Sequence, residues 1–224
     1  ATAANSGTTA TNSGATANSG AGNKPVLYVK TKEDANRKVE DLLFDGCTVS
    51  CGGSMSLKEC GISELIKSDK YIFLDRSRNG ITKEEQTEVY RSVIDCDFYL
   101  CSANALTKNG EIINVDGNAN RVSAIAFGPK KVIMVVGKNK IVNDIKDGFL
   151  RVKRIAAPKN CVRLNLDTPC AKLGHCISLQ NNDNPDIGDG CDSKSRICCQ
   201  YLISAKQRVK DRITVIICDE ELGY

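Results

Sequence analysis

Short apolar runs alternate with amphipathic stretches over most of this chain. Runs that are apolar at consecutive positions predict strands that are buried on both faces of a sheet. We expect such strands at residues 26–29, 47–51, 71–75, 97–102, 131–137 and 212–219, and a shorter one at 111–115. Strands that alternate with helices of about 12 residues indicate βαβ units. The pattern therefore predicts an α/β fold with a mostly parallel sheet flanked by helices.

Residues typical of helix N-termini lie between these apolar runs. Thr31 begins a helical stretch, and apolar residues recur at helical spacing over 141–155. A Ser or Thr followed by Glu three residues later forms a capping box, which occurs at Ser56 and at Thr82. The expected helices span about 31–44, 56–68, 82–94 and 141–155.

The pattern fails in two regions. Residues 1–24 consist almost entirely of Ala, Thr, Asn, Ser and Gly, which cannot bury enough apolar surface to fold, so we expect a flexible low-complexity tail. Between 158 and 207 the apolar periodicity is lost and cysteines are dense. We therefore divide the rest into an α/β domain at 25–160, a cysteine-rich segment at 161–203, and a last strand with its tail at 204–224 that completes the α/β domain.

Charge and composition narrow the class of protein. The net charge of +4 is small and dispersed, and Trp is absent, which argues against nucleic acid as a partner. No apolar run is long enough to cross a membrane, and no signal peptide is recognisable. Several of the 12 cysteines lie in strand-like apolar runs, where a thiol behaves as a small hydrophobe. We expect a protein of the cytoplasm or of another reducing interior compartment.

The cysteine-rich segment contains the most distinctive pattern. Cys170, Cys176, Cys191 and Cys198 are separated by 5, 14 and 6 residues, and Cys199 follows directly. Thiolates ligate both iron–sulfur clusters and structural zinc, but zinc sites usually contain two close cysteine pairs. The spacing favours a cluster, and leaves open zinc, disulfides and unligated core thiols.

Polar residues gather where the predicted strands end. Open parallel sheets bind ligands at the carboxyl edge of their strands, glycines there admit a ligand to the backbone, and Arg can grip an anion. A polar turn whose Asp bonds Arg internally is the alternative interpretation. We expect a small anionic ligand, a phosphate, carboxylate or CoA-like group, to bind at Gly52, Gly53, Ser54, Asn104, Asp116, Asn118, Asn120, Arg121 and Lys140.

Several segments together resemble the lactate-utilisation (LUD) domain family. They are GGSMSLKECG (52–61), YIFLDR (71–76), YLCSANALTKNGEIINVDGNANRV (99–122), GPKKVIMVVGKNKIV (128–142), RLNLDTPCAKLGHC (163–176), SRICCQYLI (195–203) and EELGY (220–224). The resemblance runs from about residue 49 to residue 224 and leaves out the low-complexity N-terminus. It implies a sheet similar to that of the sugar-phosphate isomerase and CoA-transferase-like group, and a link to lactate or anaerobic metabolism.

The resemblance also implies a ligand set. Members with four cysteines near the C-terminus match this chain at Cys170, Cys176, Cys191 and Cys198, which implies a [4Fe–4S] cluster with zinc as the alternative. The chain departs from the family in the long interval before Cys191, an insertion at about 179–190, and in Ala119, where Gly is usual.

Three functions follow as hypotheses. The first is an iron–sulfur electron-transfer or redox accessory protein of lactate or related organic-acid metabolism, with redox proteins as partners. The second is an enzyme that binds a small anion at the sheet edge. The third is a structural subunit whose ancestral chemistry is lost. A homodimer is compatible with each, and no motif identifies a reaction.

Overall fold

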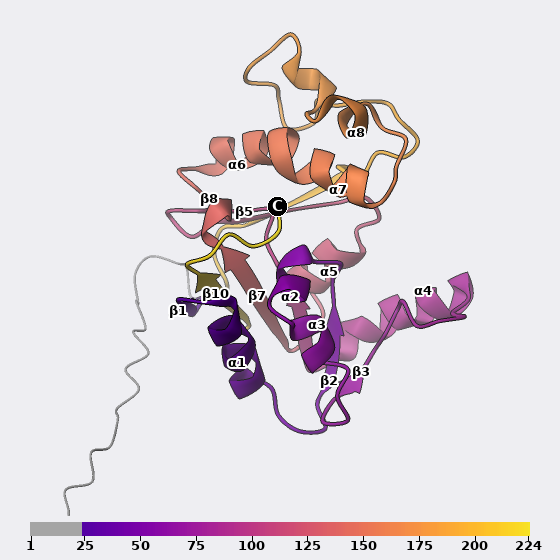
Figure 1. Ribbon diagram of the computed structural model, residues 1–224, viewed down its shortest axis with the longest axis vertical. Coiled ribbons are helices and arrows are strands. Elements are labelled where there is room, and N and C mark those ends of the chain that lie inside the picture. The colour runs from indigo at the N-terminus through magenta and orange to yellow at the C-terminus, as the bar shows by residue number, and fades with distance from the viewer. Residues whose placement is uncertain (1–23) are drawn as a thin grey trace, which may run out of the picture.

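The computed structural model describes residues 24–224 (Figure 1). The predicted tail at 1–24 lies outside the described residues except for Lys24. That lysine is buried and donates through Nζ to the carbonyls of Ser204 and Ala205.

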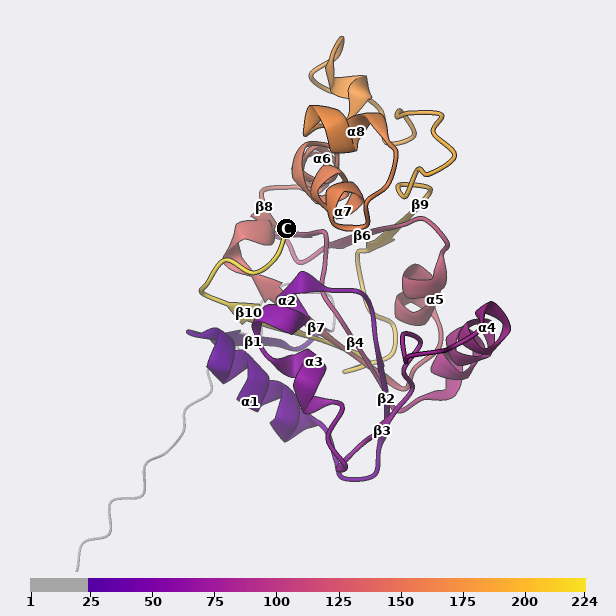
Figure 2. The same cartoon turned by 45° about the vertical axis from the view of Figure 1, so that its right-hand side comes forward.

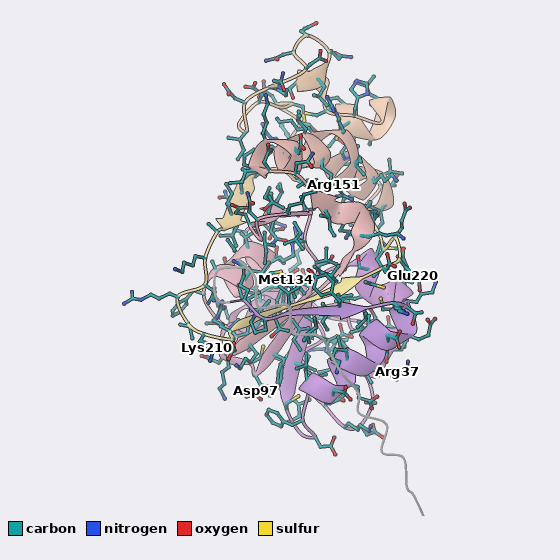
Figure 3. The ribbon with its side chains drawn as sticks, turned by 90° about the vertical axis from the view of Figure 1, so that its left-hand side faces the viewer. Arg37, Asp97, Met134, Arg151, Lys210 and Glu220 are labelled. Carbon is teal, nitrogen blue, oxygen red and sulfur yellow. The ribbon has the colours of Figure 1, made fainter. Side chains whose placement is uncertain are left out.

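A six-stranded sheet forms the centre of the molecule, and all its strands are parallel, as predicted. In spatial order the strands are β1 (Val26–Val29), β10 (Ile213–Cys218), β7 (Lys131–Gly137), β4 (Phe98–Cys101), β2 (Thr48–Cys51) and β3 (Ile72–Phe73). Six of the seven residues of β7 are buried, because helices or a second sheet cover both faces. Met134, within β7, lies inside this sheet (Figure 3).

Helices separate the strands and cover the sheet. They are α1 (Lys32–Leu42), α2 (Met55–Glu59), α3 (Ile62–Leu65), α4 (Lys83–Ser92) and α5 (Asn120–Ala126). The first three pack on one face, whereas α5 packs on the other (Figure 2). Thr31 and Thr82 close capping boxes with Asp34 and Glu85, which confirms two of the predicted helix starts.

The predicted helix start at Ser56 is wrong. Ser54 is the N-cap, because its backbone is extended and its Oγ accepts from the Leu57 N–H at 3.3 Å. Ser56 lies inside α2, where it is fully buried and its hydroxyl donates to the Leu222 carbonyl at 3.2 Å. Gly61, at a φ of +70°, then separates α2 from α3, so no single helix reaches residue 68.

A smaller mixed sheet packs against the second face of the main sheet. Its strands, in order, are β8 (Ile141–Val142), β5 (Ala105–Thr107), β6 (Ile112–Asp116) and β9 (Gln200–Ser204). Only β6 was predicted, since β5 and β8 are too short to give a periodic signal. β9 arises from the cysteine-rich segment and pairs antiparallel with β6.

The predicted helix at 141–155 begins later and extends further. β8 occupies its first two positions, and Asp144 caps α6 (Ile145–Arg151) by accepting from the Asp147 N–H at 2.9 Å. The helix continues through a π turn, η3 (Val152–Ala156), into α7 (Ala157–Arg163). Pro158 is tolerated because it stands in the first turn of α7, directly after the π turn.

This helical segment covers the outer face of the smaller sheet (Figure 1). Beyond it the chain forms α8 (Pro169–Leu173), the 3-10 turn η4 (Ile177–Leu179) and a long irregular loop before β9. Within residues 24–224 no helix is both long enough and apolar enough to cross a membrane.

Candidate functional site

A pocket of about 270 Å³ opens at the carboxyl edge of the main sheet, beneath α7. We call it the edge pocket. All nine residues predicted to bind an anion line it, and they are Gly52, Gly53, Ser54, Asn104, Asp116, Asn118, Asn120, Arg121 and Lys140.

The topology explains why distant residues meet here. Gly52, Asn104 and Lys140 follow three neighbouring parallel strands, so they emerge at the same edge. Arg121 comes instead from the first turn of α5, which directly follows β6 of the smaller sheet. The edge pocket therefore lies where the two sheets meet.

Arg121 enters the pocket without a carboxylate partner. Asp116 accepts from the backbone N–H groups of Arg121, at 2.7 Å, and Val122, at 3.2 Å, rather than from the guanidinium. The guanidinium donates to Asn104 Oδ1 at 2.8 Å and to the carbonyls of Val115 and Ser102. The internal bonding that we considered thus occurs, but through the backbone, and it leaves the Arg121 charge uncompensated.

Arg76 and Arg163 add two further guanidinium groups to the pocket lining. Neither of them was predicted from the sequence. A Cβ built on Gly53 would lie 3.2 Å from an Nη of Arg76 and 3.6 Å from an Nη of Arg163, so both guanidinium groups approach this glycine. Arg76 donates to the Tyr90 hydroxyl at 3.0 Å, and Arg163 donates to Asn160 Oδ1 at 2.7 Å. Arg76 directly follows a predicted strand, so the sheet-edge rule could have found it. No such signal marked Arg163.

The pocket lining carries excess positive charge. Among the described residues, none of the salt bridges includes Arg76, Arg121, Arg163 or Lys140. The one acidic side chain in the lining, Asp116, already accepts two backbone N–H groups. Unpaired guanidinium groups in a concave site favour an anionic ligand.

Lys140 is the most unusual cation of the pocket because its relative exposure is only 3%. Its Nζ bonds to Ser56 Oγ at 2.9 Å and to Ser102 Oγ at 3.0 Å. Burial, together with the nearby charges of Arg151 and Arg121, lowers the pKa of Lys140 to about 7. Arg151 projects from α6 (Figure 3) and donates to the carbonyls of Asn139 and Asn104, which fixes two loops of the pocket.

A second pocket, of about 10 Å³, lies on the other side of α7. We call it the cysteine pocket. Its lining includes all four predicted metal ligands, Cys170, Cys176, Cys191 and Cys198. A further thiol, Cys161, was not predicted here, but its Sγ lies 3.6 Å from that of Cys170.

Arg196 holds the two later cysteines in place. Its guanidinium donates to the carbonyls of Cys198 at 3.1 Å, Cys191 at 3.2 Å and Gly188 at 3.0 Å. The long interval before Cys191 is therefore tied back to the pocket. Lys153 is buried in the pocket wall and bonds to the carbonyl of Asp189.

Two residues that are adjacent in sequence to the predicted ligands do not line the cysteine pocket. Cys199 is exposed and its Sγ bonds to the Arg196 carbonyl, and His175 is absent from the pocket lining. Burial raises the pKa of the Cys198 thiol, whereas Arg196 opposes that rise. All 12 cysteines are free thiols in residues 24–224.

The cysteine pocket gathers soft sulfur donors, but its described residues contain no preformed site for a single ion. Four thiols line one pocket, and two cations, Lys153 and Arg196, bond to backbone carbonyls beside them. Yet within the described part of the chain no three His, Cys, Asp or Glu side chains converge closely enough to hold one metal ion. A compact tetrahedral zinc site is thus not preformed.

Comparison with known proteins places the chain in a family. The family model of the LUD domain matches residues 14–218, so this protein belongs to the LUD domain family. The match begins inside the low-complexity stretch that the resembling segments leave out. The crystal structure of a DUF162 family protein from Deinococcus radiodurans is similar, with 16% identity, coverage of 85% of this chain and 99% of that chain, and a TM-score of 0.31. No curated protein matches significantly.

Proposed function

We propose that this LUD domain protein binds a small organic acid through its carboxylate in the edge pocket. The observation that carries the proposal is the group of three arginines, Arg76, Arg121 and Arg163, none of which is paired with a carboxylate. Membership of the LUD family implies a role related to lactate utilisation, which agrees with a carboxylate as ligand.

The size of the pocket favours a small acid. A volume of about 270 Å³ is below the range of roughly 300–1,000 Å³ that encloses drug-sized ligands. A whole coenzyme A molecule would extend far outside, whereas lactate or pyruvate would fit within this volume. The polar groups of Asn104, Ser54 and Asn120 surround the cations and can bond the remaining oxygens of such a ligand.

Calorimetry with lactate, pyruvate, inorganic phosphate and coenzyme A tests this function. We expect the carboxylates to bind, and Arg76→Ala or Arg163→Ala to weaken them roughly 10–100-fold, because each removes a charge-assisted hydrogen bond. Arg78→Ala is the matched control, since Arg78 is exposed and paired with Glu85 at 3.0 Å. Equal affinities in all these proteins, or no binding by any carboxylate, would contradict the proposal.

We also propose an iron–sulfur cluster in the cysteine pocket as a second function. The supporting observation is that Cys170, Cys176, Cys191 and Cys198 line one pocket although up to 14 residues separate them. When bound, a cluster would supply one-electron transfer. The chain would then act as a redox accessory protein of organic-acid metabolism, with redox proteins as partners.

Iron and sulfide assays on protein prepared without oxygen test the cluster. We expect iron and sulfide in the wild type, a loss of both in Cys170→Ser and Cys198→Ser, and no change in Cys199→Ser, whose thiol is exposed and outside the pocket. Bound zinc, or no metal at all, would refute this second function while leaving the edge pocket unaffected.

A further inference from the structure

Lys140 has the environment of a nucleophile rather than of a simple anion-binding cation. Its amine is buried at the edge pocket and contacts two hydroxyl groups, but no carboxylate. Glu59, the acidic group whose charge reaches it, accepts instead from the Gly223 N–H at 2.7 Å. A buried ammonium without a counter-ion is costly, so this environment favours the neutral amine.

Hydrogen-bond accounting shows that the neutral amine keeps a free lone pair. The Ser56 hydroxyl donates its proton to the Leu222 carbonyl, so it accepts from Lys140. The Ser102 hydroxyl has one other contact, with the Ala103 carbonyl at 3.5 Å, and it can also accept from Lys140. When both hydroxyls accept, the two N–H groups of the amine are used and the lone pair remains available.

We propose that Lys140 forms an imine with the carbonyl carbon of a small 2-oxo acid held in the edge pocket. This inference rests on the proposed function, because an arginine of that pocket must hold the carboxylate. It extends that function from binding to covalent capture, and it specifies the substrate class as a 2-oxo acid such as pyruvate.

Ser102 contacts both the arginine proposed to bind the carboxylate and the amine of Lys140. Its carbonyl accepts from the Arg121 guanidinium at 3.5 Å, and its hydroxyl lies 3.0 Å from Lys140 Nζ. In a 2-oxo acid the carbonyl carbon is bonded directly to the carboxylate carbon. A carboxylate held by Arg121 can therefore present its adjacent carbonyl to Lys140, because both side chains contact Ser102.

The reaction balances without an oxidant or a reductant. The Nζ lone pair attacks the carbonyl carbon, and the carbonyl oxygen takes up a proton to give a carbinolamine. The hydroxyl of the carbinolamine then leaves as water, and the nitrogen loses its second proton as the C=N bond forms. Ser102 is the hydroxyl placed to relay a proton between the nitrogen and the departing oxygen.

Reductive trapping tests the proposal. The full chain is incubated with pyruvate and sodium cyanoborohydride at pH 7, and the adduct is located by peptide mass mapping. We expect one reduced pyruvyl adduct per chain, on Lys140, forming at least ~10-fold faster than on exposed lysines, which are almost fully protonated at this pH. Excess lactate, which has a carboxylate but no ketone, should suppress it.

Two variants sharpen the result. Lys140→Met should lose the adduct, whereas Lys138→Met, which removes an exposed lysine of the same turn paired with Asp219, should keep it. Mapping in the wild type decides the matter even if Lys140→Met does not fold.

Different outcomes distinguish the imine on Lys140 from the carboxylate-binding function on which it rests. Pyruvate that binds by calorimetry but yields no adduct on Lys140 overturns the imine and leaves the binding function intact. Adducts spread over surface lysines and insensitive to lactate also overturn it. Absence of pyruvate binding by calorimetry removes both the imine and the proposed binding function.

Discussion

The edge pocket and the cysteine pocket share α7 as a wall but are ordered in different ways. Asn160 and Arg163 of α7 face the edge pocket, whereas Ala157 and Pro158 face the cysteine pocket. The edge pocket is built on the ends of parallel strands and on hydrogen bonds between its own polar groups. The cysteine pocket lies between η3 and α7 on one side and α8, η4 and the irregular loop before β9 on the other.

This difference shows what each site needs from a ligand. The donors of the edge pocket are already placed, so a ligand loses little ordering entropy there. In the cysteine pocket, by contrast, Cys191 and Cys198 lie on an irregular loop that Arg196 ties back through their carbonyls, and the proposed cluster would order this loop further. The two pockets should therefore respond in opposite ways when their ligands are removed.

The largest expected effect is on the cysteine pocket. Once a cluster is present, its removal by chelation or by Cys170→Ser should raise proteolytic cleavage within residues 167–199 about 100-fold or more, because metal-binding energy there is folding energy. Limited proteolysis with mass mapping measures it. Pyruvate bound in the edge pocket should still raise the melting temperature of the cluster-free protein. Unchanged cleavage, with Cys199→Ser as control, would show that the loop is ordered without metal.

The next effect comes from Arg196→Ala. Loss of its bonds to the carbonyls of Cys191 and Cys198 should lower metal affinity roughly 10–100-fold, as the loss of supporting contacts around metal ligands usually does. Iron retention during titration with a chelator measures the change. Lys194→Ala, an exposed neighbour, is the control. If Arg196→Ala lowered pyruvate affinity as much as iron affinity, the two pockets would be energetically coupled.

Lys140→Met measures how much the buried amine of the edge pocket costs in folding stability. The lowered pKa means that the native amine is neutral where the unfolded amine is charged, so wild-type stability should rise with pH between about 7 and 10. Charged or titratable groups facing Lys140 are Arg151, Arg121, Glu59 and Cys101. The free energy of unfolding of the variant should exceed that of the wild type by about 2 kcal/mol at pH 7, because an uncompensated buried amine is removed. In the variant this free energy should no longer rise between about pH 7 and 10. Urea unfolding at several pH values measures both, and parallel pH profiles would refute the neutral amine.

Ala119→Gly should give the smallest effect. Ala119 has a φ of 62°, in the left-handed region, which costs an L-residue about 1–2 kcal/mol and explains why Gly suits this turn. The variant should be more stable by about 1 kcal/mol, as measured by urea unfolding. Ala124→Gly, in the interior of α5, should instead destabilise by at least about 0.5–1 kcal/mol. A loss of stability in both would show that the strain is relieved elsewhere.

The main sheet was predictable because its strands give a strong local signal. β7 and β10 are apolar at nearly every position, and buried parallel strands require that pattern. The smaller sheet was mostly missed because β5 and β8 hold two or three residues, too few for any period. Their pairing comes from residues distant in the chain.

The edge pocket was predictable to the extent that one rule applied. The carboxyl ends of parallel strands meet at one edge, so Gly52, Asn104 and Lys140 could be grouped from the order of the predicted strands. Arg163 escaped, because it lies on a helix that we expected to end at 155, and the π turn that carries the chain past Pro158 has no clear sequence signature. Cysteine spacing identified a candidate ligand set but could not reveal Cys161 beside Cys170.

By itself, the sequence determined the α/β class, the order of the buried strands along the chain and the residue types available for chemistry. These follow from local hydrophobic periodicity, which each segment carries alone. Tertiary structure decided which charges lack partners, which thiols share a pocket, and that the amine of Lys140 lies between Ser56 and Ser102. Such properties depend on desolvation and on neighbours supplied by distant segments, so no local pattern could have revealed them.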